Sequence, residues 1–201
     1  MFPLDTSRRE AIRQAINVPK DALMIVLVSR ASYAKGLDFA VKVMAKLRMA
    51  GTTNIYAVHC GGGTELPEFE TLADNLGAAD QFRFLGARDD VHDILCAADA
   101  AFHPSESEAM SLAILEFMCA ALPVLVPDRP SVSQTVEHEK TGLIYRHQDE
   151  DSAVGAIHRL SQNREFRLQL GVTARARCLD RYTVERANAD FERLVATRLC
   201  A

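Results

Sequence analysis

The sequence predicts an α/β fold: a Rossmann-like doubly wound parallel sheet of about six strands, followed by a helical C-terminal tail. Three observations lead to this prediction. Short apolar runs alternate with segments of helical periodicity through most of the chain, and strands that alternate with helices pair in parallel through right-handed crossovers. After Asp149 the periodicity is helical throughout. No linker rich in Pro or Gly divides residues 21–201, which therefore form one predicted domain.

Each element has its own signal, and the clearest is the run LMIVLVS within Asp21–Ser29. A continuous apolar and β-branched run of this length is typical of a strand covered on both faces. The other strands are predicted at Ile55–Cys60, residues 82–85, Ala100–His103, Val124–Val126 and Leu143–Tyr145. Helices are predicted at Leu37–Ala50, Leu66–Leu76, Val91–Ala97, across the apolar segment around Glu116, near Val132–Glu137, and in the tail at Asp151–Ser161, Arg164–Asp180 and Val184–Leu199. Residues 1–20 are polar with a helical pattern and are interpreted as an interdomain linker.

The composition excludes several classes of protein. The 201 residues are 48% hydrophobic and 25% charged, which is ordinary for a soluble globular chain. The net charge is −4 with scattered Lys and Arg, so no nucleic acid partner is expected. No apolar run reaches the roughly 18 residues of a transmembrane segment. The widely spaced cysteines form no CxxC pair and are interpreted as small core residues of a reducing, cytoplasmic compartment; they are Cys60, Cys96, Cys119, Cys178 and Cys200.

One carboxylate, Glu116, interrupts a long apolar segment that begins after Glu108. Burying an unpaired carboxylate costs several kcal/mol. Glu116 should therefore have a hydrogen-bonded partner or face a ligand. The alternative is an ordinary solvated position on the polar face of an amphipathic helix.

In a doubly wound sheet, ligands lie outside the carboxyl ends of the strands. Arg30 and Lys35 follow the first predicted strand, and two cations there suit a diphosphate. The free N–H groups of the helix predicted to begin near Ala109–Ser111 would add to an anion site. The rule as a whole selects the segments Arg30–Gly36, Gly61–Thr64, Gly86–Arg88, His103–Ser111 and Pro127–Val132.

Glu108 has two interpretations, because a carboxylate at a helix start is either a capping group or a ligand for hydroxyls. Glu116 lies eight positions later, about 12 Å along a helix at 1.5 Å per residue. That separation is too large for a shared proton or metal. The two carboxylates suit the diols at the two ends of a sugar and a ribose joined by a diphosphate.

On these residues, the chain resembles the carboxyl-terminal half of the retaining group 1 glycosyltransferases of the GT-B fold. The motifs are SRASYAKG, CGGG, RFLG, PSESEAMSLAILEFMCAALPVLVPD and TGLIY, and the landmarks run from about Phe2 to Ala189. The resemblance implies a hexosyltransferase-type enzyme of glycan biosynthesis. Its donor would be a UDP- or GDP-sugar, and no bound cofactor or metal is expected.

The resemblance also implies roles for individual residues. Arg30 and Lys35 would contact the donor diphosphate, and the backbone at Ser111 and Leu112 would cradle it. Glu108 would hold the hydroxyls of the transferred sugar and is the candidate catalytic residue, whereas Glu116 would bind the ribose. Two further donor contacts come from the glycine loop and the nucleobase segment: Gly62 and Leu85. His103 is interpreted as a structural histidine rather than a catalytic one.

The amino-terminal domain of the family, which binds the acceptor, is expected to be absent from this chain. A glycan, lipid or small-molecule acceptor would be reached through that domain, and so would any contact with a membrane surface. The isolated chain is then expected to be inactive or weakly active. Two alternatives stay open: a non-catalytic nucleotide-sugar-binding module or partner subunit, and a nucleotide-sugar epimerase of the same fold.

Overall fold

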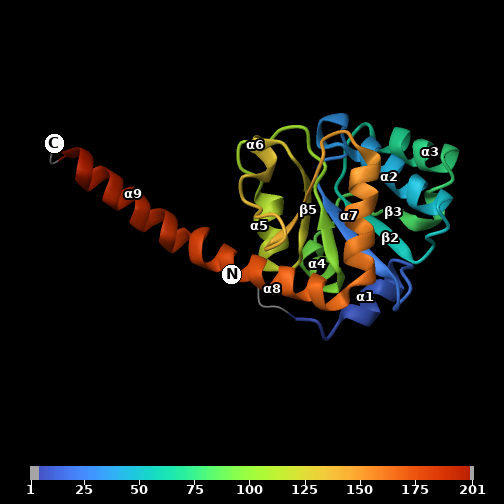
Figure 1. Ribbon diagram of the computed structural model, residues 1–201, viewed down its shortest axis with the longest axis horizontal. Coiled ribbons are helices and arrows are strands. Elements are labelled where there is room, and N and C mark those ends of the chain that lie inside the picture. The colour runs from blue at the N-terminus through green and yellow to red at the C-terminus, as the bar shows by residue number, and fades with distance from the viewer. Residues whose placement is uncertain (1–4, 200–201) are drawn as a thin grey trace.

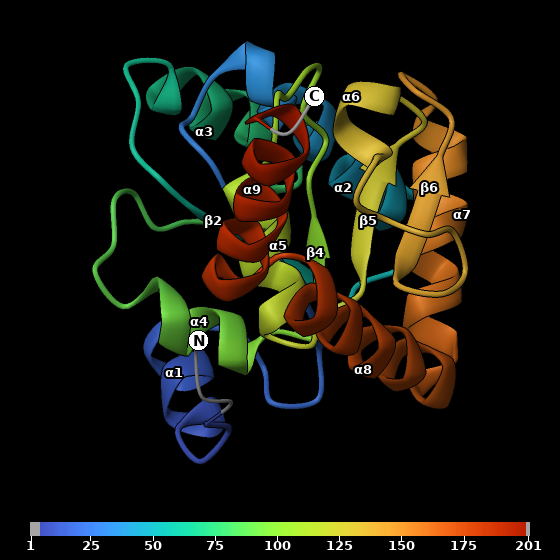
Figure 2. The same cartoon turned by 90° about the vertical axis from the view of Figure 1, so that its left-hand side faces the viewer.

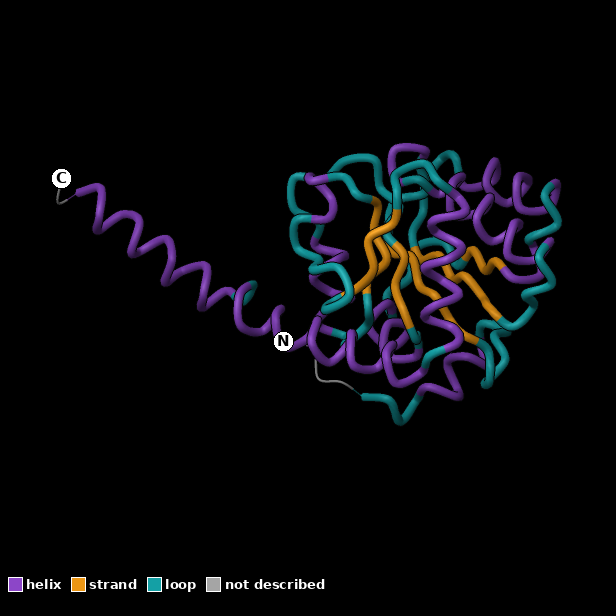
Figure 3. Tube along the Cα trace, viewed as in Figure 1, coloured by secondary structure: helices purple, strands orange, loops and turns teal. Residues whose placement is uncertain are grey.

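The computed structural model describes residues 5–199 (Figure 1). Its centre is a six-stranded parallel sheet with the order β3-β2-β1-β4-β5-β6. Figure 3 shows these strands gathered in the middle of the molecule, with helices on both sides. The strands are β1 (Leu23–Val28), β2 (Ile55–Cys60), β3 (Phe82–Phe84), β4 (Ala100–Phe102), β5 (Val124–Pro127) and β6 (Gly142–Tyr145). The predicted Rossmann-like α/β fold is confirmed.

The helices cover the two faces of the sheet in two groups. Side chains of β1 alternate between the faces, as the pleat requires: Ile25 lies in one apolar core and Met24 in the other. The first core is closed by α2 (Leu37–Met49), α3 (Leu66–Asn75) and α7 (Glu150–Gln162). The second is closed by α1 (Arg9–Ala15), α4 (Val91–Ala97), α5 (Leu112–Cys119) and α8 (Arg164–Arg181).

The predicted helical end of the chain is also confirmed, because α7 and α8 are followed by α9 (Val184–Leu199). This last helix extends away from the rest of the molecule (Figure 1), and in Figure 2, which looks from that side, it lies in front of the other elements. Its side chain Phe191 is 66% exposed. Among the described residues, no helix has both the length and the apolar character needed to cross a bilayer.

The short helix expected near Val132–Glu137 was placed too late in the chain. It is α6 (Pro130–Ser133), which begins at the proline itself. Proline suits the first turn of a helix because its missing N–H needs no partner there. The start signal of Pro130, rather than the apolar residues that follow it, therefore decides where this helix begins.

The segment interpreted as a linker contributes to the second core. Ile12 and Ile16 of this segment are buried, and α1 packs against α4. The Arg13 side chain is only 1% exposed and donates to the carbonyl oxygens of Pro19, Lys20, Ala22 and Ala97 at 2.9–3.1 Å. Its Nη2 lies 2.5 Å from Asp99 Oδ2. The interpretation of residues 1–20 as a connection to another domain stays a prediction.

Candidate functional site

The loops that follow β1 and β4 are in direct contact at the carboxyl edge of the sheet. Glu106 N donates to Ala34 O at 3.1 Å. Gly36 has a φ of +69°, and a Cβ at this position would lie 2.2 Å from Pro104 O. Only glycine permits both this backbone conformation and this approach. The contact brings the loop that carries Lys35 against the loop that carries Glu108.

We predict that Gly36→Ala destabilises the fold by about 1–3 kcal/mol, because the left-handed backbone and the clash with Pro104 both oppose a Cβ. Urea unfolding measures this change in the free energy of unfolding. Gly155→Ala in α7 is the matched control, since a Cβ there meets nothing within 4 Å and alanine favours a helix. Equal effects of the two substitutions would contradict the prediction.

Four polar side chains form a connected cluster at this contact. Glu108 Oε1 lies 2.7 Å from Lys35 Nζ and 2.9 Å from His103 Nε2. His103 Nε2 also lies 3.2 Å from Ser111 Oγ. The cluster borders a cavity of about 190 Å³ that Val28, Ser29, Met110, Leu112 and Ala113 complete.

Glu108 is held as an anion in this cluster. The hydrogen bond from His103 and the bond from Lys35 outweigh partial burial and lower the pKa of Glu108 to about 2. A carboxylate only accepts hydrogen bonds, so His103 carries a proton on Nε2 and donates a hydrogen bond to Glu108 Oε1. At neutral pH Glu108 can accept hydrogen bonds from hydroxyls, but it cannot serve as a proton donor.

This pKa predicts a loss of stability in acid. The folded pKa of about 2 lies below the reference value of 4.5, so the unfolded chain takes up the proton first. The contribution of Glu108 is complete above about pH 4.5 and is lost as the pH falls from 4.5 through 2. We expect Glu108→Gln to flatten this part of the curve of unfolding free energy against pH. Glu70→Gln controls for the loss of one surface carboxylate, and a curve of unchanged slope in Glu108→Gln would refute the assignment.

The capping interpretation of Glu108 is wrong. Ser111 is the N-cap of α5, and its Oγ accepts from Ile114 N at 3.4 Å. Because α5 begins at Leu112, Glu108 lies in the preceding loop. The separation expected for Glu108 and Glu116, which assumed that both lie on one helix, therefore does not apply.

Arg30 and Gly62 border a second cavity of about 430 Å³, which shares Val28 and Ser29 with the cavity at Glu108. Gly61 brings the glycine run against the end of β1: its φ is +147°, and a Cβ there would lie 1.8 Å from Ser29 O. Arg30 is exposed and makes no ion pair with any residue from 5 to 199.

Two further residues belong to this part of the site, Arg88 and Leu85. Arg88 also lines it and pairs with Asp90 at 2.6 Å. The sequence selected the segment Gly86–Arg88 but assigned no role to this side chain. Leu85 packs against the second apolar core, and its amide donates to His59 O at 2.9 Å. Its predicted nucleobase contact remains a prediction.

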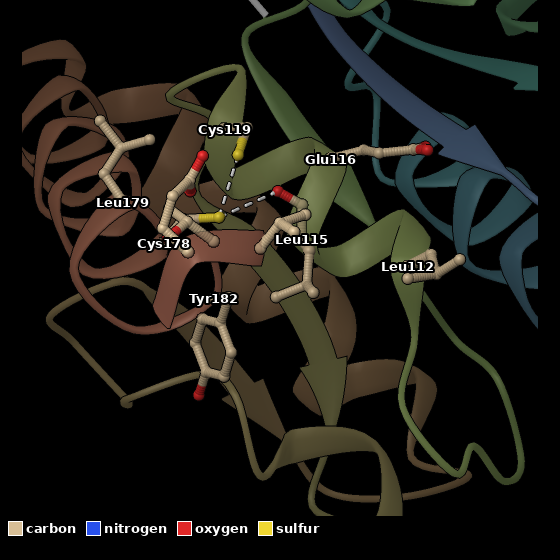
Figure 4. Close-up of a pocket in the computed structure, with 10 residues that line it drawn as sticks. Leu112, Leu115, Glu116, Cys119, Cys178, Leu179 and Tyr182 are labelled. Atoms are coloured by element: carbon tan, nitrogen blue, oxygen red, sulfur yellow. Dashed lines mark hydrogen bonds between the residues drawn. The ribbon is translucent and has the colours of Figure 1, made fainter. Parts of the chain in front are cut away.

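Glu116 lies on α5 beside a third cavity of about 320 Å³. Figure 4 shows its carboxylate pointing toward the β1 ribbon and away from the sulfurs of Cys119 and Cys178, which lie 2.9 Å apart. Burial raises the pKa of Glu116, and its carboxylate has no hydrogen-bond partner in the described part of the chain. Leu112 borders both this cavity and the one at Glu108.

The family model of glycosyl transferases group 1 matches residues 8–177. The chain belongs to this family. An uncharacterised glycosyltransferase of Methanocaldococcus jannaschii is 27% identical over 186 residues, which cover 90% of this chain and 47% of that protein. The lipopolysaccharide glucosyltransferase WaaG of Escherichia coli is 32% identical over 120 residues, 58% of this chain and 31% of WaaG.

Solved structures show the same fold. Anabaena HepE in complex with UDP superposes with a TM-score of 0.88 at 21% identity, over 96% of this chain and 53% of HepE. The crystal structure of WaaG gives a TM-score of 0.79 at 22% identity, over 90% of this chain and 48% of that one. This group 1 glycosyltransferase chain thus spans about half the length of the proteins to which it is similar.

Proposed function

We propose that this group 1 glycosyltransferase domain binds the nucleoside diphosphate sugar donor of a retaining transfer reaction. The observation that carries the proposal is the Lys35–Glu108–His103 cluster, with Ser111 beside it, at the carboxyl edge of the sheet. It places a cation and an anion together where an α/β sheet binds ligands. The HepE structures with UDP and with UDP-glucose support a donor of this class.

The donor would exchange contacts with this cluster. Lys35 and Arg30 would neutralise the diphosphate, and the N–H groups at the start of α5 would add to them. Glu108, an anion at neutral pH, would accept hydrogen bonds from the hydroxyls of the sugar. His103 would stay bonded to Glu108 while Lys35 turns to the diphosphate, and we therefore assign His103 the role of a positioning residue.

Glu116 would bind the ribose of the donor. Its partly buried carboxylate has no protein partner among residues 5–199, and a pair of ribose hydroxyls would supply two donors. The turn after β3 would receive the nucleobase through its backbone. Stabilisation of the departing nucleoside diphosphate by fixed cations and helix N–H groups is the main catalytic contribution of such a site.

Transfer also requires an acceptor and the exclusion of water. The matched relatives are about twice as long as the region they share with this chain, which supports an acceptor-binding half outside it. We therefore expect donor binding by the chain alone, with little turnover. The choice of UDP or GDP and of sugar is part of the test below.

Isothermal titration against UDP, GDP and their sugars tests the proposal. We expect saturable binding that Glu116→Ala weakens about tenfold or more, as for a hydrogen bond to a charged group. Glu116→Ala should leave binding of inorganic pyrophosphate unchanged, whereas Arg30→Ala should weaken both. Glu70→Ala is the control for lost surface charge. Absence of binding by every nucleoside diphosphate would refute the proposal.

A further inference from the structure

A second concave region lies at the opposite edge of the sheet. A cavity of about 470 Å³ is bordered by the amino ends of β1 and β2, by residues 20–22, and by the start of α8. A neighbouring cavity of about 360 Å³ shares Arg9, Asp99, Arg164 and Arg167 with it. In Figure 1, α1 and the start of α8 lie at the lower end of the sheet, and α6 lies at the upper end.

Positive charge in this region exceeds negative charge. The cavity of about 470 Å³ is bordered by four cations and two carboxylates. The cations are Arg9, Lys20, Arg164 and Arg167, and the carboxylates are Asp21 and Asp99.

Asp99 is already committed to other partners. Its oxygens accept from Arg9 at 2.6 Å, from Arg13 at 2.5 Å and from Met24 N at 2.9 Å. In the part of the chain that the structure describes, Lys20, Arg164 and Arg167 make no ion pair. Of the four cations that border the cavity, three therefore have no ion-pair partner among the described residues, and only the carboxylate of Asp21 lies with them unpaired.

Two of these cations occupy an unfavourable position. Arg164 and Arg167 lie at the start of α8, where the positive end of the helix dipole repels cations. Burial lowers the pKa of Arg167, and repulsion from Arg164 and Arg9 lowers it further against the attraction of Asp99. A hydrogen bond to Leu160 O nevertheless holds the Arg167 guanidinium in place. An anion in the cavity would relieve this repulsion.

We propose that this cavity binds a small phosphorylated metabolite, with its phosphate held by Arg164, Arg167 and Lys20. Arginine forks suit phosphate oxygens, and a dianion matches the surplus of cations. The volume lies within the range of small-molecule sites, and Thr52, Asn54 and Ser161 supply a polar wall for the rest of the ligand. The site is distinct from the donor site, because β1 separates them by about 20 Å at 3.3 Å per residue.

Amide NMR spectra of the full chain localise such binding. We expect inorganic phosphate and a hexose 6-phosphate to shift amides of residues 20–23, 52–55 and 161–167. The unphosphorylated hexose should not shift them, and the hexose 6-phosphate should bind at least as tightly as inorganic phosphate. Shifts near residues 29–36 and 103–113 report the donor site separately.

The double substitution Arg164→Gln/Arg167→Gln should weaken this binding at least tenfold. Arg181→Gln/Arg186→Gln removes the same charge from exposed positions and should leave it unchanged. The proposal is overturned by absent shifts at millimolar phosphate, by equal losses in both variants, or by a response to inorganic phosphate alone. Binding to phosphatidylglycerol vesicles without shifts from soluble phosphates would overturn it as well.

Discussion

Replacement of Asp99 by alanine should destabilise the fold by about 3–5 kcal/mol, the cost of leaving a buried charge without its partner. Arg13 is 1% exposed and pairs with Asp99 at 2.5 Å. Asp99 also joins β1 to α1, because it accepts from Met24 N and from Arg9. The free energy of unfolding of a typical domain is about 5–15 kcal/mol. This single substitution should therefore remove a large part of it.

Chemical unfolding in urea measures the effect on the free energy of unfolding. Asp99→Asn should cost less than Asp99→Ala, since an amide oxygen still accepts from Met24 N. Asp80→Ala provides the control: its carboxylate is 78% exposed and pairs with Arg48 at the surface, and such pairs contribute about 0–1 kcal/mol. A cost for Asp99→Ala below 1.5 kcal/mol would contradict the role assigned to this pair.

Lys35→Met should weaken binding of the nucleoside diphosphate sugar about 100-fold, or roughly 3 kcal/mol. Two effects combine in this prediction, which depends on the proposed function. The substitution removes a cation from the diphosphate, and it removes the positive charge that screens the phosphates from the anionic Glu108, which lies 2.7 Å from Lys35. Isothermal titration with the donor that the panel identifies gives the ratio of affinities.

A double-mutant cycle separates these two effects. In the Glu108→Gln background the repulsion is absent, so Lys35→Met should cost less there than in the wild type. Lys42→Met, which breaks an exposed pair with Asp38, should leave affinity unchanged. An identical cost of Lys35→Met in both backgrounds would show that the ion pair with Glu108 has no part in donor binding.

Local patterns predicted the elements of this fold well. The continuous apolar run of β1 is a strand buried on both faces, and the helices α4 and α9 occupy the predicted residues. The starts of two helices differ from the sequence expectations. Ser111 rather than Glu108 caps α5, and Pro130 starts α6. In both cases the residue with the stronger preference for that position occupies it.

The candidate site was predictable only in part, because its contacts join segments far apart in the sequence. The rule that ligands lie at the carboxyl ends of the strands selected Lys35 and His103–Ser111 as parts of one site. It gave no sign that Lys35 and His103 both bond to the same oxygen of Glu108. The cation-lined cavity at the other edge had no sequence signal, since Arg9 and Arg167 come together only when α1 and α8 reach the same end of the sheet.

The central place of β1 also bears on how the chain reaches its fold. β1 pairs with β2 and β4, with Ile25 opposite Ala100. During synthesis, one side of β1 therefore has no strand partner until the ribosome has released residues as far as β4. Parallel pairing between such distant segments is intrinsically slow and leaves apolar strands open to aggregation meanwhile. Early association of β1 with β2, which is the next strand in the chain and pairs with β1 in the sheet, would limit that exposure.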